Sequence, residues 1–416
     1  MRKREFLRTL GGASLALLFG EDLWARYAAL PPHQVAQDEA FWARIRRQFL
    51  LTPEYINLEN GYYQMQSQPV LEAFISRVRD VNRQASRYMR TRQFDDKAAV
   101  RDRLAAMAGV PPETLIITRN TTESLDTVIG GFHWEAGDEA VMAEQDYGAM
   151  LDMFRLQARR HGIVNRVVSL PMDPASDEEI VQLYEGAMGS RTRLLMVCHM
   201  VNITGQLLPV AKIADMAHRH GVQVMVDGAH SFAQLEFSVS DLHCDYFAAS
   251  LHKWLACPLG AGILHVRRDH IAELWPTFAD LGVPDDDIRK LNHTGTHPVH
   301  TDLAINDAID FHEGIGIRRK EARLRYLQRY WTEKVRGVPG ITLNSPSDPA
   351  RTGAIGNVGV AGHAPAELMR TLFERYHIWT VAIDGAGVHG VRITPHVFTS
   401  TADVDALVRA LRELAA

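Results

Sequence analysis

Apolar residues gather in seven short runs between residues 115 and 266, and segments with helical periodicity separate most of these runs. The runs are Leu115–Thr118, Glu139–Met142, Val164–Val168, Leu194–Val197, Val222–Val226, Tyr246–Ala248 and Gly262–Val266. The helical segments are Asn120–Ile129, Met150–Arg160, Glu178–Met188 and Val210–His220. Short strands that alternate with helices are typical of a mostly parallel sheet with helices on both faces. We therefore predict an α/β fold with a seven-stranded central sheet.

The pattern on either side of these runs predicts further units. Residues 69–109 have helical periodicity that stops at Gly109, which is followed by two prolines. The stretch from Ala308 to Arg336 predicts one long, Arg-rich helix, and a small α+β pattern follows Pro346 and ends in a helix over Ala402–Leu414. We expect an N-terminal arm at 31–68, a large domain at 69–305, and a linking helix with a small C-terminal domain at 306–416.

The first 30 residues have the character of a targeting segment. A basic start is followed by an apolar run from Leu10 to Phe19, which is too short to span a bilayer but suits a signal peptide. The sequence Lys3-Arg4-Glu5-Phe6-Leu7-Arg8 resembles the twin-arginine export motif, with Lys3 in place of the first arginine. We expect export to the periplasm without stable membrane insertion. The alternative is an amphipathic N-terminal helix that docks on the body of the protein, which would then stay in the cytoplasm.

Composition narrows the function without naming it. The chain is 46% hydrophobic and 23% charged, with a formal net charge of −5, which is ordinary for a soluble globular protein. No long basic block is present, so we expect no nucleic-acid partner. The three cysteines (Cys198, Cys244 and Cys257) lack CxxC spacing. Small-molecule chemistry is the first expectation.

Polar residues stand directly after several predicted strands, where parallel sheets bind their ligands. Thr121 and Thr122 open a helix after the first strand, which suits a phosphate seat or ordinary helix capping. Asn202 follows the fourth strand and is explained equally by a ligand contact or a turn. Asp227 and His230 follow the fifth strand, where a buried carboxylate needs a partner, although a helix cap also accounts for Asp227.

A lysine follows the sixth predicted strand in the segment Ser250-Leu251-His252-Lys253-Trp254. Its apolar surroundings would desolvate the amine, lower its pKa and make it nucleophilic toward a carbonyl. Together with Asp227 and the hydroxyls of the helix start, this lysine describes the site that pyridoxal phosphate needs: an amine, a carboxylate for the ring nitrogen and a phosphate seat.

In the order Thr-Thr-Glu, Asp-Gly-Ala-His and Ser-x-His-Lys-Trp, these motifs resemble the class V aminotransferase family of fold-type I pyridoxal-phosphate enzymes, especially its isopenicillin N epimerase-like branch. The resemblance spans roughly residues 40–415. It implies that Lys253 forms a Schiff base with the cofactor and moves the α-proton, and that Asp227 pairs with the ring nitrogen. The further contacts that it implies are His230 and Asn202 at the ring oxygen or nearby substrate, and Thr121, Thr122, Ser250 and His252 at the phosphate.

The same resemblance implies four more roles. Tyr147 would stack on the cofactor, although a packed loop aromatic is the alternative, and Thr296 would reach the phosphate of a partner subunit in a homodimer. Arg392 would bind the α-carboxylate of an amino-acid substrate, for which a planar guanidinium is well suited, or it is an exposed strand charge. The segment around Asn60 would line the substrate side.

The reaction type is open at this level, because one fold and one lysine serve several chemistries. Transamination makes the fewest demands, and it is our leading expectation. Epimerisation and carbon–sulfur cleavage are the alternatives. Desulfuration through a persulfide is disfavoured, because no cysteine follows Cys257. A non-catalytic binding protein would not need Lys253 and Asp227. A metal enzyme is a weaker hypothesis, since His293, His297 and His300 lack the HExxH spacing.

Overall fold

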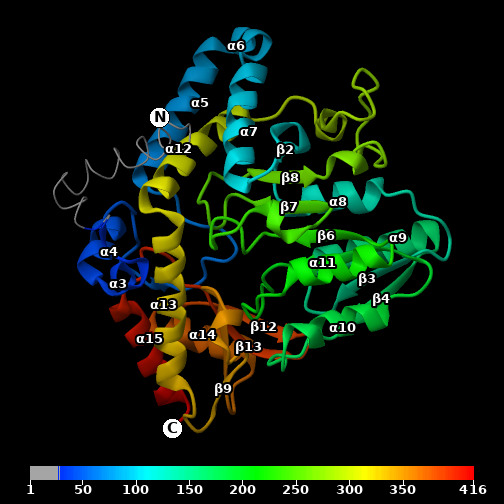
Figure 1. The fold of residues 1–416 in the computed structure, drawn as a ribbon. Coiled ribbons are helices and arrows are strands. Elements are labelled where there is room, and N and C mark those ends of the chain that lie inside the picture. The colour runs from blue at the N-terminus through cyan, green and yellow to red at the C-terminus, as the bar shows by residue number, and fades with distance from the viewer. Residues whose placement is uncertain (1–26, 28) are drawn as a thin grey trace.

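A seven-stranded sheet forms the centre of the chain (Figure 1). The structure is a computed structural model that describes residue 27 and residues 29–416. The strand order is β2-β8-β7-β6-β5-β3-β4, and every neighbouring pair is parallel except those that involve β8. The strands are β2 (Leu115–Thr118), β3 (Glu139–Ala143), β4 (Val164–Val168), β5 (Thr192–Cys198), β6 (Gln223–Asp227), β7 (Tyr246–Ser250) and β8 (Gly262–Val266). The predicted α/β fold with a seven-stranded, mostly parallel sheet is confirmed.

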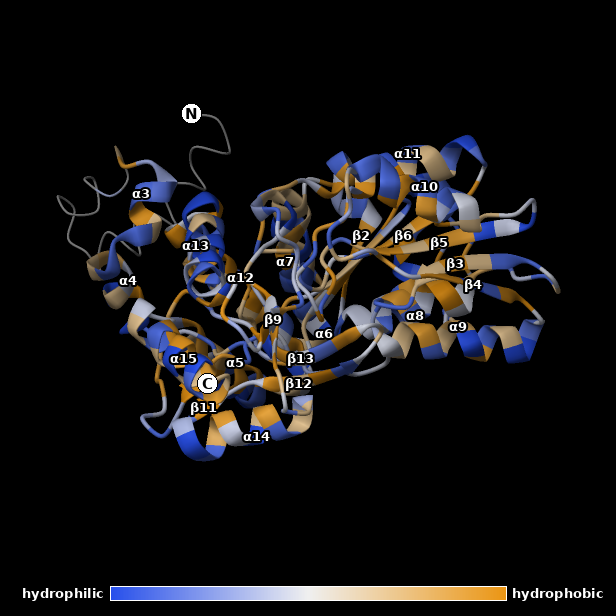
Figure 2. Cartoon of the chain, turned by 90° about the horizontal axis from the view of Figure 1, so that it is seen from below, coloured by the Kyte–Doolittle hydropathy of each residue, from blue (hydrophilic) through white to orange (hydrophobic). Residues whose placement is uncertain are grey.

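Helices cover both faces of this sheet because alternate strand residues point to opposite sides. In β5, Leu195 and Val197 pack in one core cluster, whereas Leu194 and Met196 pack in the other. Figure 2 shows helices on both sides of the strands. Helices α10 (Asp177–Ala187) and α11 (Val210–Arg219) cover the first face, and α8 (Thr121–Gly131) and α9 (Gly148–His161) cover the second. All four lie where the periodicity predicts them.

Two segments with a helical sequence pattern are each divided into more than one helix in the structure. The segment 69–109 forms α5 (Gln68–Gln84), α6 (Ser86–Thr91) and α7 (Gln93–Ala108), because Ala85 takes a left-handed φ of 47° that ends the first helix. The expected helix over Ala308–Arg336 is instead the C-terminal part of α12 (Val299–Ile315) followed by α13 (Ile317–Val335), with Gly316 at a φ of 85° between them. Glycine adopts that conformation without a Cβ clash. The prediction of a single helix over Ala308–Arg336 was therefore wrong, whereas the helical character and the stop at Gly109 expected for residues 69–109 are confirmed.

The C-terminal part contains a second sheet of four antiparallel strands in the order β12-β13-β10-β9. Its elements are β9 (Ile341–Leu343), β10 (Gly356–Val360), α14 (Pro365–Tyr376), β12 (Val381–Gly385), β13 (Val388–Ile393) and α15 (Thr401–Leu414). A core cluster joins this sheet to α13 through Trp331 and to the N-terminal segment through Leu58. This part of the chain therefore has the α+β character that the sequence predicts.

The N-terminal segment runs from two short helices into the small sheet region. Helices α3 (Pro32–Gln37) and α4 (Glu39–Arg46) lead to β1 (Ile56–Asn57), which pairs in parallel with β11 (Ile378–Trp379). The proposed targeting segment falls almost entirely outside the described residues. Within residue 27 and residues 29–416, none of the helices has both the length and the apolar character needed to cross a bilayer. The 3₁₀ turns are η1 (Pro112–Thr114), η2 (Val239–Leu242), η3 (Arg268–His270), η4 (Ile288–Asn292) and η5 (Pro349–Arg351).

Candidate active site

The carboxyl ends of β6 and β7 bring together the two ionisable residues that the sequence predicts to be central. Asp227 is the last residue of β6, and its Cα is paired across the sheet with Ala248 of β7. β7 ends two residues later at Ser250, and the turn that follows carries Lys253. Parallel pairing thus sets both side chains at the same edge of the sheet, as expected for a ligand site.

The amine of Lys253 lies in a largely dehydrated setting among polar and charged side chains. Its Nζ is 3.0 Å from Nε2 of His230. Burial lowers the pKa of Lys253 to about 8, and the negative charge of Asp227 partly opposes this shift. Since an ordinary lysine has a pKa near 10.4, a much larger share of this amine is unprotonated at neutral pH. The geometry therefore provides a nucleophilic amine.

His230 contacts the Lys253 amine from a buried position. The ring is 5% exposed, and burial keeps the pKa of His230 well below its ordinary value, so the imidazole is neutral. Its Nδ1 accepts a hydrogen bond from Nε1 of Trp254 at 3.4 Å. A neutral imidazole with an accepting Nδ1 carries its proton on Nε2, which then donates to the lone pair of Lys253. The predicted contact of His230 with the ligand region is thus joined by a direct contact with Lys253.

Asp227 is a buried carboxylate with few protein partners. It is 6% exposed, and in the described part of the chain it accepts one hydrogen bond, from the Ala229 amide to Oδ1 at 2.9 Å. Burial raises its pKa, while the positive charge of Lys253 acts in the opposite direction. An aspartate in this state lacks the donor that would stabilise its charge. A protonated ring nitrogen of a ligand would supply it.

Thr121 and Ser250 meet at the start of α8. The Thr121 amide donates to Ser250 Oγ at 2.9 Å, and the two side-chain hydroxyls are 2.7 Å apart. Thr122 lies in the same first helical turn, where free N–H groups favour an anion. Gly262 permits this arrangement, because a Cβ there would lie 2.7 Å from the Asn120 backbone. The structure thus brings Thr121 and Ser250, two of the four residues predicted to hold a phosphate, together from the start of α8 and the end of β7.

Several buried polar atoms around these residues have no hydrogen-bond partner within the described residues. They are His199 Nδ1, Asn202 Oδ1 and His252 Nδ1. Burial lowers the pKa of both His199 and His252 to about 4, so both rings are neutral. Buried polar atoms are normally paired. An amine, a buried carboxylate, a helix N-terminus with hydroxyls and these unsatisfied atoms together fit a polar aromatic cofactor with a phosphate, such as pyridoxal phosphate.

Arg392 lies in β13 beside the N-terminal segment and is 6% exposed, so the alternative of an exposed strand charge is wrong. Its Nη2 is 2.6 Å from Oε1 of Glu59, its Nε is 3.3 Å from Oε2, and its Nη1 donates to the Asn202 carbonyl at 3.2 Å. The family resemblance placed the segment around Asn60 at the substrate side but gave no role to Glu59. The acidic side chain next to Asn60 was the signal that could have indicated a partner for Arg392.

Asn60 takes part in a backbone contact at this end of the site. It is fully buried, and its side chain donates to the Thr394 carbonyl at 2.8 Å and accepts from Asn57 at 3.0 Å. Its amide also donates to Thr394 Oγ1 at 2.8 Å. These bonds join the N-terminal segment to the end of β13. Asn60 therefore supports the position of its neighbour Glu59, while direct contact with substrate stays a prediction.

Tyr147 and Thr296 are the two predicted site residues whose side chains are exposed. Tyr147 precedes α9 and is 44% exposed, so it is not a packed loop aromatic. Thr296 is exposed in the connection between η4 and α12. In the same connection, His297 contacts Asp302 at 3.0 Å. Cofactor stacking by Tyr147 and the partner-subunit contact of Thr296 stay predictions.

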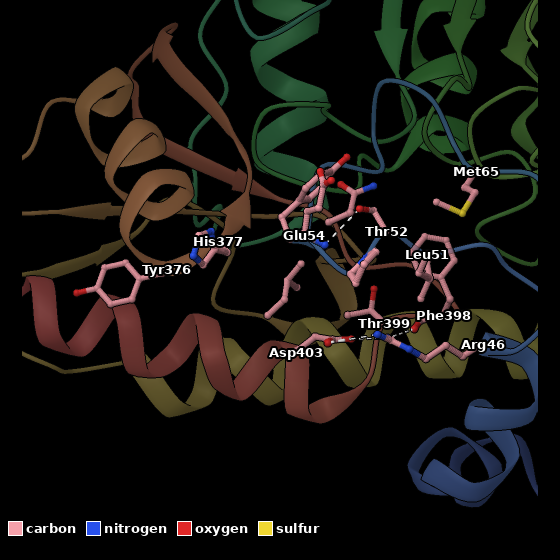
Figure 3. A pocket seen from close by; sticks show the side chains of 14 residues that line it. Arg46, Leu51, Thr52, Glu54, Met65, Tyr376, His377, Phe398, Thr399 and Asp403 are labelled. Carbon is pink, nitrogen blue, oxygen red and sulfur yellow. Dashed lines mark hydrogen bonds and ion pairs between the residues drawn. The ribbon is translucent and has the colours of Figure 1, made fainter.

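A cavity of about 350 Å³ lies apart from these residues, between the N-terminal segment and the small domain (Figure 3). Its lining includes Arg46, Thr52, His377 and Asp403, and Arg46 and Asp403 form an ion pair across it. Neither Lys253 nor any residue predicted to hold the phosphate contributes to this lining. The cavity is therefore separate from the candidate active site.

Known proteins resemble this chain over most of its length. The family model described as Aminotransferase class-V matches residues 64–410. An isopenicillin N epimerase of Amycolatopsis lactamdurans is 32% identical, with 90% of this chain and 98% of that protein covered. A cysteine desulfurase of Pectobacterium carotovorum is 27% identical over 76% of this chain and 81% of its own length. The solved structure of a C-DES mutant, with glycine covalently linked to its PLP cofactor, has a TM-score of 0.80 at 22% identity and covers 89% of this chain and 99% of its own.

Proposed function

Because the chain belongs to the class-V aminotransferase family, we propose that it is a pyridoxal-phosphate enzyme that inverts the α-carbon of an amino acid. The observation that carries this proposal is the buried amine of Lys253, which contacts neutral His230 and lies at the sheet edge beside Asp227. Similarity to isopenicillin N epimerases over 90% of the chain favours epimerisation over the transamination expected from the sequence. The sequence-based preference for an aminotransferase is therefore replaced by its alternative.

The residues of the chain divide the work between them. When bound, pyridoxal phosphate supplies a pyridinium ring that takes up the electron pair released at the substrate α-carbon. Asp227 holds a proton on the ring nitrogen. Lys253 takes the α-proton from one face of the α-carbon as a general base, and a pKa of about 8 suits that task. Inversion requires a second donor that returns a proton on the opposite face. His230 orients the Lys253 amine, and Thr121 with Ser250 holds the phosphate.

A carbon–sulfur lyase is the second candidate, since cysteine desulfurases are among the relatives. A persulfide-forming enzyme needs a mobile nucleophilic cysteine. In this chain Cys198, Cys244 and Cys257 are all buried, and burial raises the pKa of each thiol, which disfavours the reactive thiolate. The stretch Val381–Gly390, which forms β12 and the first half of β13, contains no cysteine. This favours epimerisation over desulfuration through a protein thiol.

Holoenzyme incubated with single amino acids in deuterated water tests the proposed reaction. We expect deuterium at the α-carbon together with inversion of configuration, measured by mass spectrometry and chiral chromatography. Accumulated pyridoxamine phosphate would instead identify an aminotransferase, and released pyruvate or sulfide would identify a lyase. Either result would overturn the proposal. Borohydride should fix the cofactor on Lys253, and Lys253→Ala should abolish exchange, whereas the exposed control Lys212→Ala should not.

We also propose a homodimer and export to the periplasm. The dimer proposal is supported by exposed Thr296 and by large exposed apolar side chains in the neighbouring segment, Trp275, Phe278 and Leu281. Light scattering of the purified protein tests the dimer, and a monomer with full activity would contradict it. The export proposal is supported by the basic and apolar pattern of residues 1–30. Cell fractionation of wild type and of Arg4→Ala tests it, and an unchanged cytoplasmic distribution would contradict it.

A further inference from the structure

The Glu59 carboxylate pairs with Arg392, the arginine to which the family resemblance assigns the substrate α-carboxylate. Glu59 and Arg392 form an ion pair in which each side chain is 8% exposed. Two contacts join them, Nη2 to Oε1 at 2.6 Å and Nε to Oε2 at 3.3 Å. Two parallel contacts between a guanidinium and a carboxylate are the geometry by which arginine recognises carboxylate ligands. Glu59 therefore imitates a bound carboxylate.

The backbone that carries Glu59 is tightly fixed against β13. The Thr394 amide donates to the Leu58 carbonyl at 2.7 Å, and the side chain of Asn60 donates to the Thr394 carbonyl at 2.8 Å. Gly61 completes the approach, because a Cβ there would lie 2.9 Å from Nη2 of Arg392. Any exchange at Arg392 must therefore come from rotation of the Glu59 side chain, since the backbone has no room to withdraw.

The Glu59 carboxylate has other donors when it leaves the guanidinium. The Tyr62 amide lies 3.0 Å from Oε1, and the Thr394 hydroxyl lies 3.2 Å from Oε2. These neutral donors satisfy hydrogen bonds but do not compensate the charge. A buried carboxylate separated from its cation is costly unless another cation replaces it. The ligand that displaces Glu59 must therefore bring a positive charge with its own carboxylate.

A second carboxylate cannot simply join the first. Glu59 uses Nε and Nη2 of Arg392, and the Asn202 carbonyl uses Nη1. One guanidinium already neutralised by a buried carboxylate attracts a further anion weakly, and two carboxylates at one site repel each other. Lys253 lies close enough for both Glu59 and Arg392 to affect its pKa, so the exchange takes place beside the reacting amine.

We propose that Glu59 is an internal competitor for the substrate carboxylate and a specificity-determining residue of the site. In the complex that forms before its amino group reacts with the cofactor, a zwitterionic α-amino acid exchanges one ion pair for two: its carboxylate pairs with Arg392, and its ammonium group pairs with the released Glu59. A simple carboxylate without an amine leaves Glu59 uncompensated and binds weakly. This inference rests on the proposed function for the identity of the substrate, but the ion pair itself does not.

Binding of propionate, a carboxylate without an amine, tests the proposal without any turnover. Isothermal titration calorimetry is performed on wild-type and Glu59→Gln holoenzyme, with Glu54→Gln as a matched control from the same segment, where the side chain is exposed. We expect the Kd for propionate to fall about tenfold in Glu59→Gln and to stay unchanged in Glu54→Gln. An unchanged or higher Kd in Glu59→Gln would overturn the proposal, because it would mean that Glu59 only orients Arg392.

Two further measurements guard the test. If Glu59→Gln does not fold, Glu59→Asp keeps the charge but shortens the side chain, and its Kd for propionate should fall about threefold; no change there would equally overturn the proposal. In the double variant Glu59→Gln/Arg392→Gln the gain should disappear, and a retained gain would locate propionate elsewhere and reject the competition. The proposed reaction is tested separately by α-deuteration, so failure of inversion and failure of the propionate test are distinguishable.

Discussion

Two buried aspartates at opposite edges of the central sheet have contrasting environments. Asp227 ends β6 at the edge that carries Lys253, and it accepts one backbone hydrogen bond. Asp245 directly precedes β7 at the other edge, where Arg267 Nη1 lies 2.6 Å away, His218 Nε2 2.9 Å and His270 Nε2 3.2 Å. Burial alone would raise the pKa of Asp245, but the hydrogen bonds from His270 and His218 outweigh it and lower the pKa. At Asp227 burial prevails and the pKa is raised.

The difference separates structural charge from charge held for a ligand. Asp245 has cationic partners within the protein, so its charge stabilises the fold. Among the described residues, Lys253 is the cation that lowers the pKa of Asp227, and burial lowers the pKa of this lysine itself to about 8. An unsatisfied buried carboxylate lowers the stability of the fold, and such groups with shifted pKa values are found mainly at functional sites. Exchanging each aspartate for the neutral asparagine tests this division.

The largest expected effect is the loss of stability in Asp245→Asn. Removing one member of a buried ion network leaves the others uncompensated, so we expect the free energy of unfolding to fall by about 3–5 kcal/mol. Urea unfolding followed by circular dichroism measures it, with exposed Asp241→Asn as the control. The kcat of the folded fraction should match wild type. A loss of kcat with unchanged stability would place Asp245 in the catalytic machinery instead.

The next effect is on turnover in Asp227→Asn. Without the carboxylate the ring nitrogen loses its counter-charge, and we expect kcat to fall by about 10²–10³-fold, as for other preorganised electrostatic contacts. The cofactor-free variant should be at least as stable as cofactor-free wild type, because a buried carboxylate without a strong partner has been removed. Steady-state kinetics at saturating cofactor and thermal unfolding measure the two quantities. A variant that keeps kcat within threefold would remove Asp227 from its assigned role.

The smallest expected effect is on the pH dependence of the free energy of unfolding, which should differ from wild type with opposite sign in the two variants. Each tenfold change in an acid dissociation constant on folding contributes on the order of 1 kcal/mol. The pKa of Asp245 is lowered on folding, so its contribution to stability is present above about pH 3.9, the ordinary aspartate value, and is lost as pH falls through the folded value. The pKa of Asp227 is raised, so the gain from Asp227→Asn should be full above the folded pKa and vanish as pH falls below about 3.9. Unfolding curves from about pH 2 to pH 8 check both signs; parallel curves would contradict them.

The strands were predictable because most of them are short runs of buried apolar residues. Every predicted run overlaps an observed strand. The helix breaks at Ala85 and Gly316 were not, because a left-handed residue within a helical pattern is fixed by packing rather than by local propensity. The convergence of Asp227 and Lys253 was predictable because parallel strands end at one edge. The pairing of Glu59 with Arg392 was not, because the periodicity of a chain carries no record of contacts between residues so far apart in sequence.

The pairing of Glu59 with Arg392 also bears on how the site comes into being during synthesis. Every residue assigned to the phosphate, the ring nitrogen and the amine of one chain lies between Thr121 and Lys253, whereas Arg392 belongs to one of the last strands. At about 5–20 residues per second, the ribosome takes on the order of ten seconds to travel from Lys253 to Arg392. Glu59, made long before, does not meet this guanidinium until then. The residues assigned to the cofactor are therefore all synthesised before the arginine that pairs with Glu59.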